Sequence, residues 1–230
     1  MHPKPLFDTA ILVFANSADT DSHIKKIGGN TSLFDALNAH SLKIVKASGL
    51  PYFHFTEKEQ VGETFGERFT HALQSLFDKG FANIIAIGND SPQLKTQHLL
   101  EAHQHLQLGK TVLGPAVDGG FYLLGLHASN FNPESFAGLP WQMTTLFNAT
   151  RHHFESGGCT VFSLNRLLDI DSASDIKRLS NHISTLADRW LSLFSKILGE
   201  TIAFLEAGHT TRKNIFLFIP FNKGSPVVFS

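Results

Sequence analysis

The amino-acid sequence predicts an α/β fold in which helices cover a mostly parallel, partly mixed β-sheet. Short, continuous apolar runs alternate along the chain with longer segments whose apolar residues recur every three or four positions. The first pattern is typical of buried strands and the second of amphipathic helices. Strands that alternate with helices form parallel units with right-handed crossovers. We therefore expect the loops after residues 15, 87 and 113 to lie along one edge of the sheet.

Each predicted strand is a short apolar run next to turn-forming residues. The clearest run is Asn83-Ile-Ile-Ala-Ile87, which is followed directly by Gly88. Such a run lacks polar alternation because both faces of a central parallel strand are buried. We expect strands at residues 10–15, 51–55, 83–87, 111–113, 121–126 and 160–164.

Capping residues and apolar stripes predict the helices. Thr64 and Glu67 have the spacing of a capping box, in which each side chain bonds a free amide at the start of the helix. Gly80 would end that helix, and Ser172 with Asp175 can begin a later one. We expect helices at residues 32–48, 64–80, 96–106, 141–154 and 183–205, and another from about residue 172.

The C-terminal part of the chain differs from the rest. A predicted helix over residues 183–205 is followed by a tail, residues 215–229, that is unusually apolar for a terminus. We expect one domain over residues 1–182 and an extension over residues 183–230. The tail would pack on its own domain, add an edge strand, or bury itself against a second subunit in a homodimer.

Composition excludes several classes of protein. Hydrophobic residues make up 42% and charged residues 17% of the 230 positions, which is typical of a globular protein rather than a disordered one. A formal net charge of −1 gives no basic surface for nucleic acid. Cys159 is the only cysteine, so neither an internal disulfide nor a cysteine-based zinc site can form. No apolar run reaches the roughly 18 residues of a membrane span, and we expect a soluble protein of the cytoplasm.

Two turns that contain aspartate follow predicted strands. Asp90 stands in Gly88-Asn-Asp-Ser-Pro, and Asp118 precedes Gly119-Gly120. Open α/β sheets bind ligands beyond the carboxyl ends of their strands. Carboxylates at that edge suit a hard divalent cation that carries phosphates. The two turns therefore predict a crevice for a phosphate-bearing substrate.

Each candidate in these turns also has a structural alternative. Asp90 can cap its own turn, and Asn89 can act as a neutral ligand beside it. Asp118 can be a turn former, while Gly119 and Gly120 either let a ligand approach the backbone or supply a positive φ.

Further candidates lie elsewhere in the chain. Asp169 and Asp171 flank Ile170, and one of them, preferably Asp171, would complete a metal site with Asp90, although acids there also favour the start of a helix. Other candidates have both a functional and a structural interpretation. Arg68 would clamp a phosphate or be a surface cation, and Trp141 would stack on a ligand or be a core residue. Phe121 and Tyr122 would line an acceptor pocket or belong to the core.

Several motifs resemble one bacterial family. They are Gly66-Glu-Arg68, Gly88-Asn-Asp-Ser-Pro-Gln-Leu94, Gly114-Pro-Ala-Val-Asp-Gly-Gly-Phe-Tyr-Leu-Leu-Gly125, Pro140-Trp141 and Asp169-Ile-Asp171, in order across residues 10–180. The family is classed by similarity as glycosyltransferases of the nucleotide-diphospho-sugar transferase superfamily. Its members resemble proteins with the GT-A (Rossmann-like) fold, so the resemblance implies a three-layer sandwich over residues 1–182.

The resemblance also implies a function. A nucleotide-activated sugar would be the substrate, and Mg²⁺ or Mn²⁺ bound by Asp90 and Asp171 would stabilise the diphosphate leaving group. Substrate contacts would come from Asn89, Asp118, Gly119, Gly120, Arg68 and Trp141; no side chain is identified as a catalytic base. The alternatives are a nucleotidyltransferase for a phosphorylated small molecule and a non-catalytic nucleotide- or sugar-binding module.

The N-terminal loop departs from the family pattern. Family members carry a lysine and a basic phosphate-binding loop where this chain has Asn16 followed by Asp19 and Asp21. Acidic groups repel phosphates, so the loop predicts weaker nucleotide binding in the family's manner. Lys25 and Lys26 would substitute from the next turn, or would simply be solvated.

Overall fold

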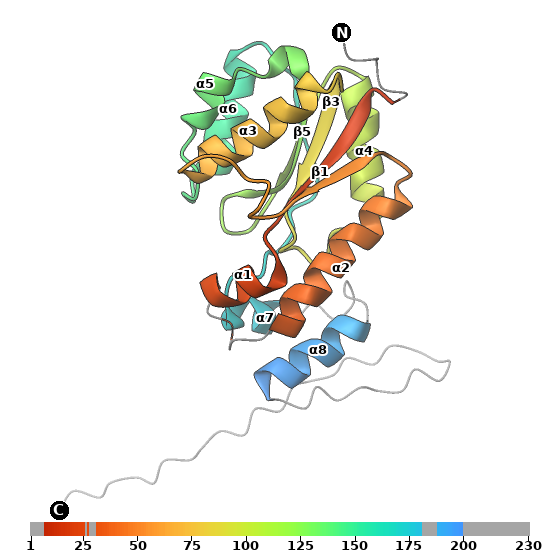
Figure 1. Cartoon of the computed structure of the whole chain (residues 1–230), viewed down its shortest axis with the longest axis vertical. Coiled ribbons are helices and arrows are strands. Elements are labelled where there is room, and N and C mark those ends of the chain that lie inside the picture. Colours follow the sequence, from red (N-terminus) through yellow and green to blue (C-terminus); the bar gives the residue numbers. More distant parts are fainter. Residues whose placement is uncertain (1–6, 26, 28–30, 181–187, 200–230) are drawn as a thin grey trace, which may run out of the picture.

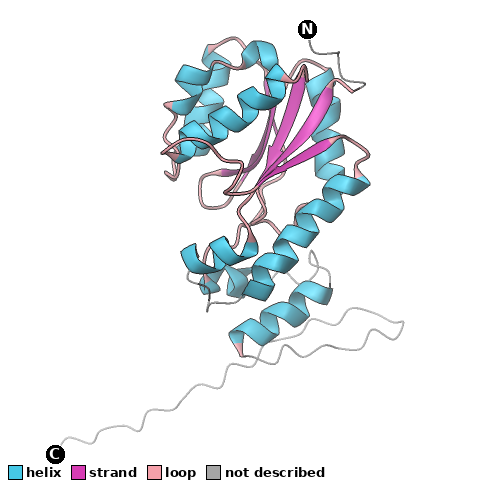
Figure 2. Cartoon of the chain, viewed as in Figure 1, coloured by secondary structure: helices cyan, strands magenta, loops and turns pink. Residues whose placement is uncertain are grey.

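The computed structural model describes residues 7–25, 27, 31–180 and 188–199. Within these residues six strands form one sheet, in the order β2-β1-β3-β5-β4-β6 (Figures 1 and 2). The strands are β1 (Thr9–Phe14), β2 (Tyr52–Phe55), β3 (Asn83–Ile87), β4 (Thr111–Pro115), β5 (Phe121–His127) and β6 (Val161–Ser163). Each lies within one or two residues of a predicted strand at both ends, because the apolar runs form the strands; the inner strands are buried, and the edge strands β2 and β6 are only partly buried.

All strands of this sheet except β5 run in the same direction. β1 is parallel to β2 and β3, and β4 is parallel to β6. β5 is antiparallel to both of its neighbours, β3 and β4. The carboxyl ends of β1, β3, β4 and β6 therefore meet at one edge, as the alternation of elements predicts.

The helices follow most of the predicted boundaries. They are α1 (Ala18–Ile24), α2 (Thr31–Ala47), α3 (Phe65–Asp78), α4 (Thr96–Gln107), α5 (Pro133–Ala137), α6 (Leu146–Ser156), α7 (Ala173–Ser180) and α8 (Asp188–Leu198). The capping box of Thr64 and Glu67 is present at the start of α3. Two short helices, α1 and α5, are not predicted from the sequence, because neither is long enough to show an apolar stripe.

One helix begins later than the sequence predicts. α6 starts at Leu146 rather than at residue 141, because the chain turns first. Gln142 has a φ of 62°, a left-handed conformation that ends helical continuity. The prediction ignored this turn because Trp141 and Leu146 carry an apolar pattern through it.

Helices cover both faces of the sheet, which gives the predicted three-layer sandwich (Figure 1). Ile11 and Val13 of β1 point to the face covered by α2 and α4. Ala10 and Leu12 alternate with them and point to the face covered by α3, α5 and α6. Both apolar layers are nearly closed to solvent, since period-two alternation sends successive side chains of a strand to opposite faces.

A third apolar cluster lies beyond the carboxyl edge of the sheet. Helices α1, α2, α7 and α8 meet there around the buried side chains of Phe34, Trp190 and Phe194. Leu168 and Ile170, from the segment after β6, belong to the same cluster. The cluster therefore fixes the segment that carries Asp169 and Asp171.

The C-terminal extension is described in part. α8 falls inside the predicted helix over residues 183–205 and packs on α7 (Figure 1). The apolar tail, and with it the predicted edge strand or homodimer contact, lies outside the described residues. Among the helices that the structure describes, none combines the length and apolar character needed to cross a membrane.

Candidate functional site

Two loops meet at the carboxyl edge of the sheet. The backbone N–H of Ile170 donates a 2.9 Å hydrogen bond to the carbonyl oxygen of Asp90. The N–H of Leu168 donates to Gln93 Oε1 at 3.1 Å. The loop after β3 is thus joined to the segment after β6, which brings the carboxylate of Asp90 beside those of Asp169 and Asp171. The side chain of Gln93 therefore has a structural role in joining the two segments.

Lys25 bridges two of these carboxylates. Its Nζ lies 2.5 Å from Asp90 Oδ1 and 3.1 Å from Asp171 Oδ1, and it also donates to the carbonyl oxygen of Ile170 at 3.4 Å. The Lys25 side chain is only 17% exposed. Of the two substitutes proposed from the sequence, Lys25 is therefore a cation inside the crevice and not a solvated surface residue; Lys26 lies outside the described residues.

Charge interactions favour the ammonium form of Lys25. Burial alone would lower the pKa of the Lys25 ammonium, but Asp90 and Asp171 outweigh burial and raise its pKa above the usual value. Burial raises the pKa of Asp90, and the adjacent Lys25 lowers it in part. Oδ1 of Asp90 is buried, whereas its side chain as a whole is 31% exposed, so the rest of the carboxylate faces the crevice.

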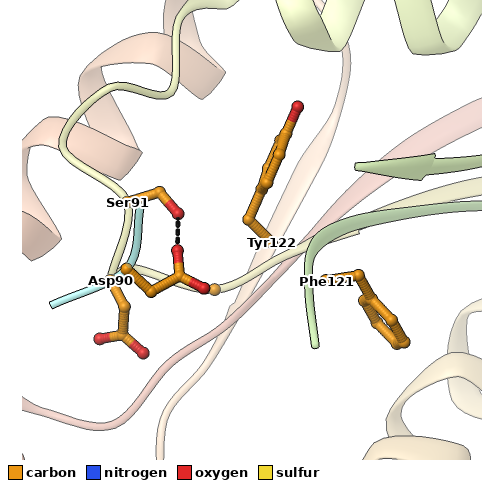
Figure 3. Close-up of a pocket in the computed structure, with 6 residues that line it drawn as sticks. Asp90, Ser91, Phe121 and Tyr122 are labelled. Atoms are coloured by element: carbon orange, nitrogen blue, oxygen red, sulfur yellow. Dashed lines mark hydrogen bonds between the residues drawn. The ribbon is translucent and has the colours of Figure 1, made fainter. Parts of the chain in front are cut away.

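A small pocket opens beside Asp90 (Figure 3). Its volume is about 60 Å³, well below the few hundred Å³ of a site that encloses a whole small-molecule ligand. It can therefore receive one chemical group of a ligand that lies in the open crevice. Its lining residues are Gly88, Asp90, Ser91, Phe121, Tyr122 and Asp169.

Asp169 and Ser91 form a hydrogen-bonded pair in this pocket. The Ser91 hydroxyl donates to Asp169 Oδ1, a bond that Figure 3 draws as a dashed line. The pKa of Asp169 is raised to about 7, mainly by burial and also by the negative charges of Asp90, Asp118 and Asp171, against the opposing effect of the hydrogen bond from Ser91. Asp169 and Asp171 thus lie close to Asp90 but contact different partners.

Tyr122 forms another wall of the pocket. Its ring packs over Gly114, where a Cβ would collide with it, and its hydroxyl donates to the carbonyl oxygen of Asn165 at 2.8 Å. Tyr122 and Phe121 project to opposite sides of β5 (Figure 3). Tyr122 is buried and Phe121 partly exposed, so both are core residues that also line the pocket.

The altered N-terminal loop forms a polar network. Asp21 is 4% exposed and accepts hydrogen bonds from Asn16 Nδ2 and Asn89 Nδ2, each at 3.0 Å. Asn89 also donates to Asn38 Oδ1 at 2.8 Å, and Asn38 donates to the carbonyl oxygen of Asn16 at 3.1 Å. Asp21 therefore points inward, and the amide group of Asn89 faces this network. Asp19 remains exposed on α1.

The start of α1 already has an anionic partner. The Ser17 backbone N–H and hydroxyl donate to Glu57 Oε2 and Oε1 at 2.7 and 2.8 Å. The backbone N–H of Thr20 donates to Ser17 Oγ. The hydrogen bond from the Ser17 backbone lowers the pKa of Glu57 to about 2. The carboxylate of Glu57 thus stands where a phosphate-binding loop would offer its amides.

The second aspartate turn is held by its own backbone. Asp118 Oδ1 accepts a 2.9 Å hydrogen bond from the N–H of Gly120, as in an Asx turn. Gly119 has a φ of 97°, and a Cβ there would collide with the carbonyl oxygen of Thr144. These contacts match the structural alternative for Asp118 and Gly119; the ligand contacts remain predictions.

Arg68 and Trp141 have partners within the fold. Arg68 Nη1 donates to the carbonyl oxygen of Glu63 at 2.8 Å. The indole N–H of Trp141 donates to the carbonyl oxygen of Phe136 at 3.1 Å, and its ring lies 5.9 Å from that of Phe121. Trp141 therefore backs a pocket-lining ring. Substrate contact by either residue remains a prediction.

The carboxylates allow a limited metal site. Among the described residues, no group of three or more His, Cys, Asp or Glu side chains is arranged to hold a metal ion. Mg²⁺ is commonly bound by one or two carboxylates together with substrate phosphates. Asp90 and Asp171 fit that requirement, because both present hard oxygen donors, but Lys25 now contacts the same oxygens.

Sequence reasoning did not identify several residues of this region. Asn38 and Glu57 act through contacts with residues far along the chain, so no local pattern marks them. Ser91 alone had a signal, its position directly after Asp90 in the turn.

Comparisons with known proteins agree with this architecture. Residues 46–143 match the family described as an uncharacterized protein conserved in bacteria (DUF2064). A crystal structure from Desulfovibrio desulfuricans G20, of a protein assigned as a nucleotide-diphospho-sugar transferase, is 21% identical. Its match covers 84% of this chain and 98% of that chain, with a TM-score of 0.70. No curated protein matches the chain.

A mycobacterial structure has the same fold. Rv0371c from Mycobacterium tuberculosis H37Rv is 13% identical, covers 76% of this chain and 98% of that chain, and has a TM-score of 0.50. At such identities the likeness concerns the fold alone. The resemblance drawn from the sequence motifs is confirmed to this extent: residues 46–143 match the model of a bacterial family, and the fold is similar to that of the Desulfovibrio desulfuricans protein.

Proposed function

We propose that the protein is a transferase that binds a nucleotide-diphospho sugar in the crevice at the carboxyl edge of the sheet. The observation that supports this proposal is the junction of two loops by the Ile170–Asp90 hydrogen bond. The junction places the carboxylates of Asp90 and Asp171 around one largely buried ammonium group, that of Lys25, and the carboxylate of Asp169 beside Asp90. Such a mixture of fixed charges suits a diphosphate accompanied by a divalent cation.

Asp90 and Asp171 are the proposed ligands for Mg²⁺ or Mn²⁺. When bound, the cation would neutralise negative charge on the diphosphate leaving group. Lys25 lies beside both carboxylates. Its ammonium would bind a phosphate oxygen, since a lysine is a mobile point charge on a flexible stem.

The small pocket suits the acceptor. Its volume admits a single group, and Asp169 and Ser91 offer it a carboxylate and a hydroxyl. An acceptor hydroxyl would be oriented there by a hydrogen bond to Asp169. The position of these side chains at the pocket, next to Asp90, supports this assignment.

Nucleotidyl transfer onto a phosphorylated small molecule is the second candidate. That reaction depends on a phosphate-binding loop at the N-terminus. Here Glu57 occupies the amide and hydroxyl of Ser17 at the start of α1. A carboxylate in that position repels a triphosphate, so sugar transfer ranks first. A non-catalytic binding module would use the same crevice without turnover.

Calorimetry with a ligand panel tests the proposal. Nucleoside diphosphates and nucleotide sugars are titrated into the wild type and Asp90→Ala, with and without Mn²⁺. We expect metal-dependent binding to the wild type that Asp90→Ala loses. Asp78→Ala is the control, because Asp78 is an exposed aspartate and the last residue of α3. This variant should bind the ligands as the wild type does.

The outcomes separate the candidates. If no nucleotide binds at any Mn²⁺ concentration, the transferase proposal fails. Pyrophosphate released from a nucleoside triphosphate in the presence of a sugar phosphate would favour nucleotidyl transfer. Tight binding of a nucleotide sugar without transfer to any of a panel of acceptors would favour the binding module.

A further inference from the structure

The crevice carries its own cation. Among the described residues, the ion pairs formed by Asp90 and Asp171 both go to the ammonium group of Lys25. A third contact, to the carbonyl oxygen of Ile170, completes the oxygen surroundings of Nζ. Two carboxylates and a carbonyl are the donor types that a hard divalent cation prefers. Lys25 therefore lies in surroundings that suit a metal ion.

The ammonium and a divalent cation cannot share these oxygens. Mg²⁺ and Mn²⁺ bind oxygen at about 2.0–2.2 Å, closer than the present nitrogen–oxygen distances. An ion bound through Oδ1 of both carboxylates would therefore fill the space that Nζ now occupies. Two cations in contact repel strongly where water is partly excluded. One must leave before the other binds.

The charge balance also favours replacement of the ammonium over binding of both cations. Two carboxylates and one ammonium carry a net charge of −1, and replacing the ammonium by a divalent cation gives 0. Keeping both cations would give +1 around a buried carboxylate oxygen. A diphosphate that arrives with the metal would supply the negative charge that a displaced ammonium needs.

We propose that Lys25 is an internal counter-cation that competes with a divalent cation for Asp90 and Asp171. The metal alone binds weakly because it must displace Lys25. A diphosphate strengthens metal binding by giving the ammonium a new partner. The competition requires only a metal, whereas the effect of the diphosphate rests on the proposed function.

The geometry of Lys25 allows this exchange. Lys25 is the C-cap of α1 and its backbone is extended, with φ −88° and ψ 116°. Its backbone N–H bonds to the carbonyl oxygen of Asp21, which anchors the main chain. The ammonium is held only at the tip of a flexible four-carbon stem, so it can move without a change in the helix.

Direct measurement of Mn²⁺ affinity tests the competition. Free Mn²⁺ is followed by electron paramagnetic resonance during titration of the wild type, Lys25→Met and Lys25→Arg at pH 8 without nucleotide. We expect Lys25→Met to bind Mn²⁺ about tenfold more tightly than the wild type, since a competing positive charge is gone. Lys25→Arg keeps the charge and should stay within about threefold of the wild type.

Lys46→Met is the matched control, because Lys46 is an exposed lysine on α2 and its loss should leave Mn²⁺ affinity unchanged. Equal or weaker Mn²⁺ binding by Lys25→Met would overturn the proposal. Equal gains in Lys25→Met and Lys46→Met would also overturn it, because a general charge effect would then explain the result. Circular dichroism checks that each variant is folded.

A second measurement uses the wild type and does not depend on the folding of variants. Lysines are labelled with an acetylating reagent at increasing Mn²⁺, and the labelling of Lys25 is read by mass spectrometry. Displacement predicts that Lys25 becomes more reactive as Mn²⁺ saturates the protein, while Lys46 does not change. An unchanged Lys25 at saturating Mn²⁺ would refute the competition.

Nucleotide binding is measured separately, so that the proposed function and the competition can fail independently. Adding a nucleoside diphosphate should raise the Mn²⁺ affinity of the wild type more than that of Lys25→Met. If no nucleotide binds but Lys25→Met still gains Mn²⁺ affinity, the proposed function fails and the competition stands. If nucleotides bind and Lys25→Met gains no Mn²⁺ affinity, the competition fails and the proposed function stands.

Discussion

The backbone N–H of Ile170 bonds to the carbonyl oxygen of Asp90 at 2.9 Å, and this contact joins two loops that follow different strands. The Ile170 side chain is fully buried in the cluster formed by α1, α2, α7 and α8. The packing of these helices therefore determines where Asp169 and Asp171 lie relative to Asp90. Helices outside the sheet thus support the crevice at its edge.

The network around Asp21 is expected to stabilise the altered N-terminal loop. Replacing Asp21 by alanine leaves the amides of Asn16 and Asn89 without their shared acceptor in a buried place. We expect Asp21→Ala to lower the free energy of unfolding by about 2 kcal/mol. Urea denaturation measures the loss. Asp19→Ala removes an exposed aspartate of the same helix and should change stability by less than about 0.5 kcal/mol; equal effects of the two variants would contradict the network.

The turn that carries Asp118 depends on one glycine rather than on both. Gly119→Ala would strain a positive φ and press a Cβ on the carbonyl oxygen of Thr144. We expect a loss of about 2 kcal/mol or more in the free energy of unfolding. Gly120→Ala meets its nearest atom, an exposed oxygen of Asp118, at 3.3 Å and should cost less than about 1 kcal/mol. Thermal or urea unfolding of the two variants compares them, and the reverse order of stability would show that the turn is described wrongly.

His40 makes stability depend on pH. Burial lowers its pKa, and the nearby cations Arg189 and Lys43 lower it further, although a hydrogen bond to the carbonyl oxygen of Leu94 opposes this. The unfolded chain has the ordinary histidine pKa of about 6.5 and so takes up the proton first as the pH falls. The stability contributed by neutral His40 is therefore fully present above about pH 6.5. It is lost as the pH falls from there through the lower pKa that His40 has in the folded state.

Urea denaturation at pH 7.5 and pH 5 measures this dependence. We expect His40→Gln, which can still donate to Leu94, to lose less stability between the two pH values than the wild type does. His71→Gln changes an exposed histidine of α3 and should keep the wild-type dependence. A His40→Gln variant with the wild-type dependence would rule out His40 as the source.

The strands could be predicted from the sequence because their signal is local. β3 begins and ends at the predicted residues, and its apolar run is the buried centre of the sheet. The capping box of α3 was likewise visible in two residues three positions apart. The turns that follow predicted strands identified Asp90 and Asp118 as candidates, and the position of Asp171 beside Ile170 added a third.

The contacts that organise the crevice could not be predicted in this way. Lys25 and Ile170 lie 145 positions apart, and Asn89 and Asp21 lie 68 apart. No periodicity or short motif records such pairs, because only the closed fold brings them together. The sequence suggested that Asp21 would face the phosphates, whereas it is buried as the acceptor of two asparagine amides.

The carboxylates of Asp90 and Asp171 and the ammonium that bridges them can be observed directly. Crystals grown with Mn²⁺ and the nucleoside diphosphate that binds most tightly in the calorimetric panel allow a direct test by anomalous scattering from manganese. We expect an anomalous peak bound by Asp90 and Asp171, with Lys25 moved from these carboxylates to a phosphate oxygen. A bound diphosphate with no manganese at this pair, and with Lys25 still bridging Asp90 and Asp171, would contradict it.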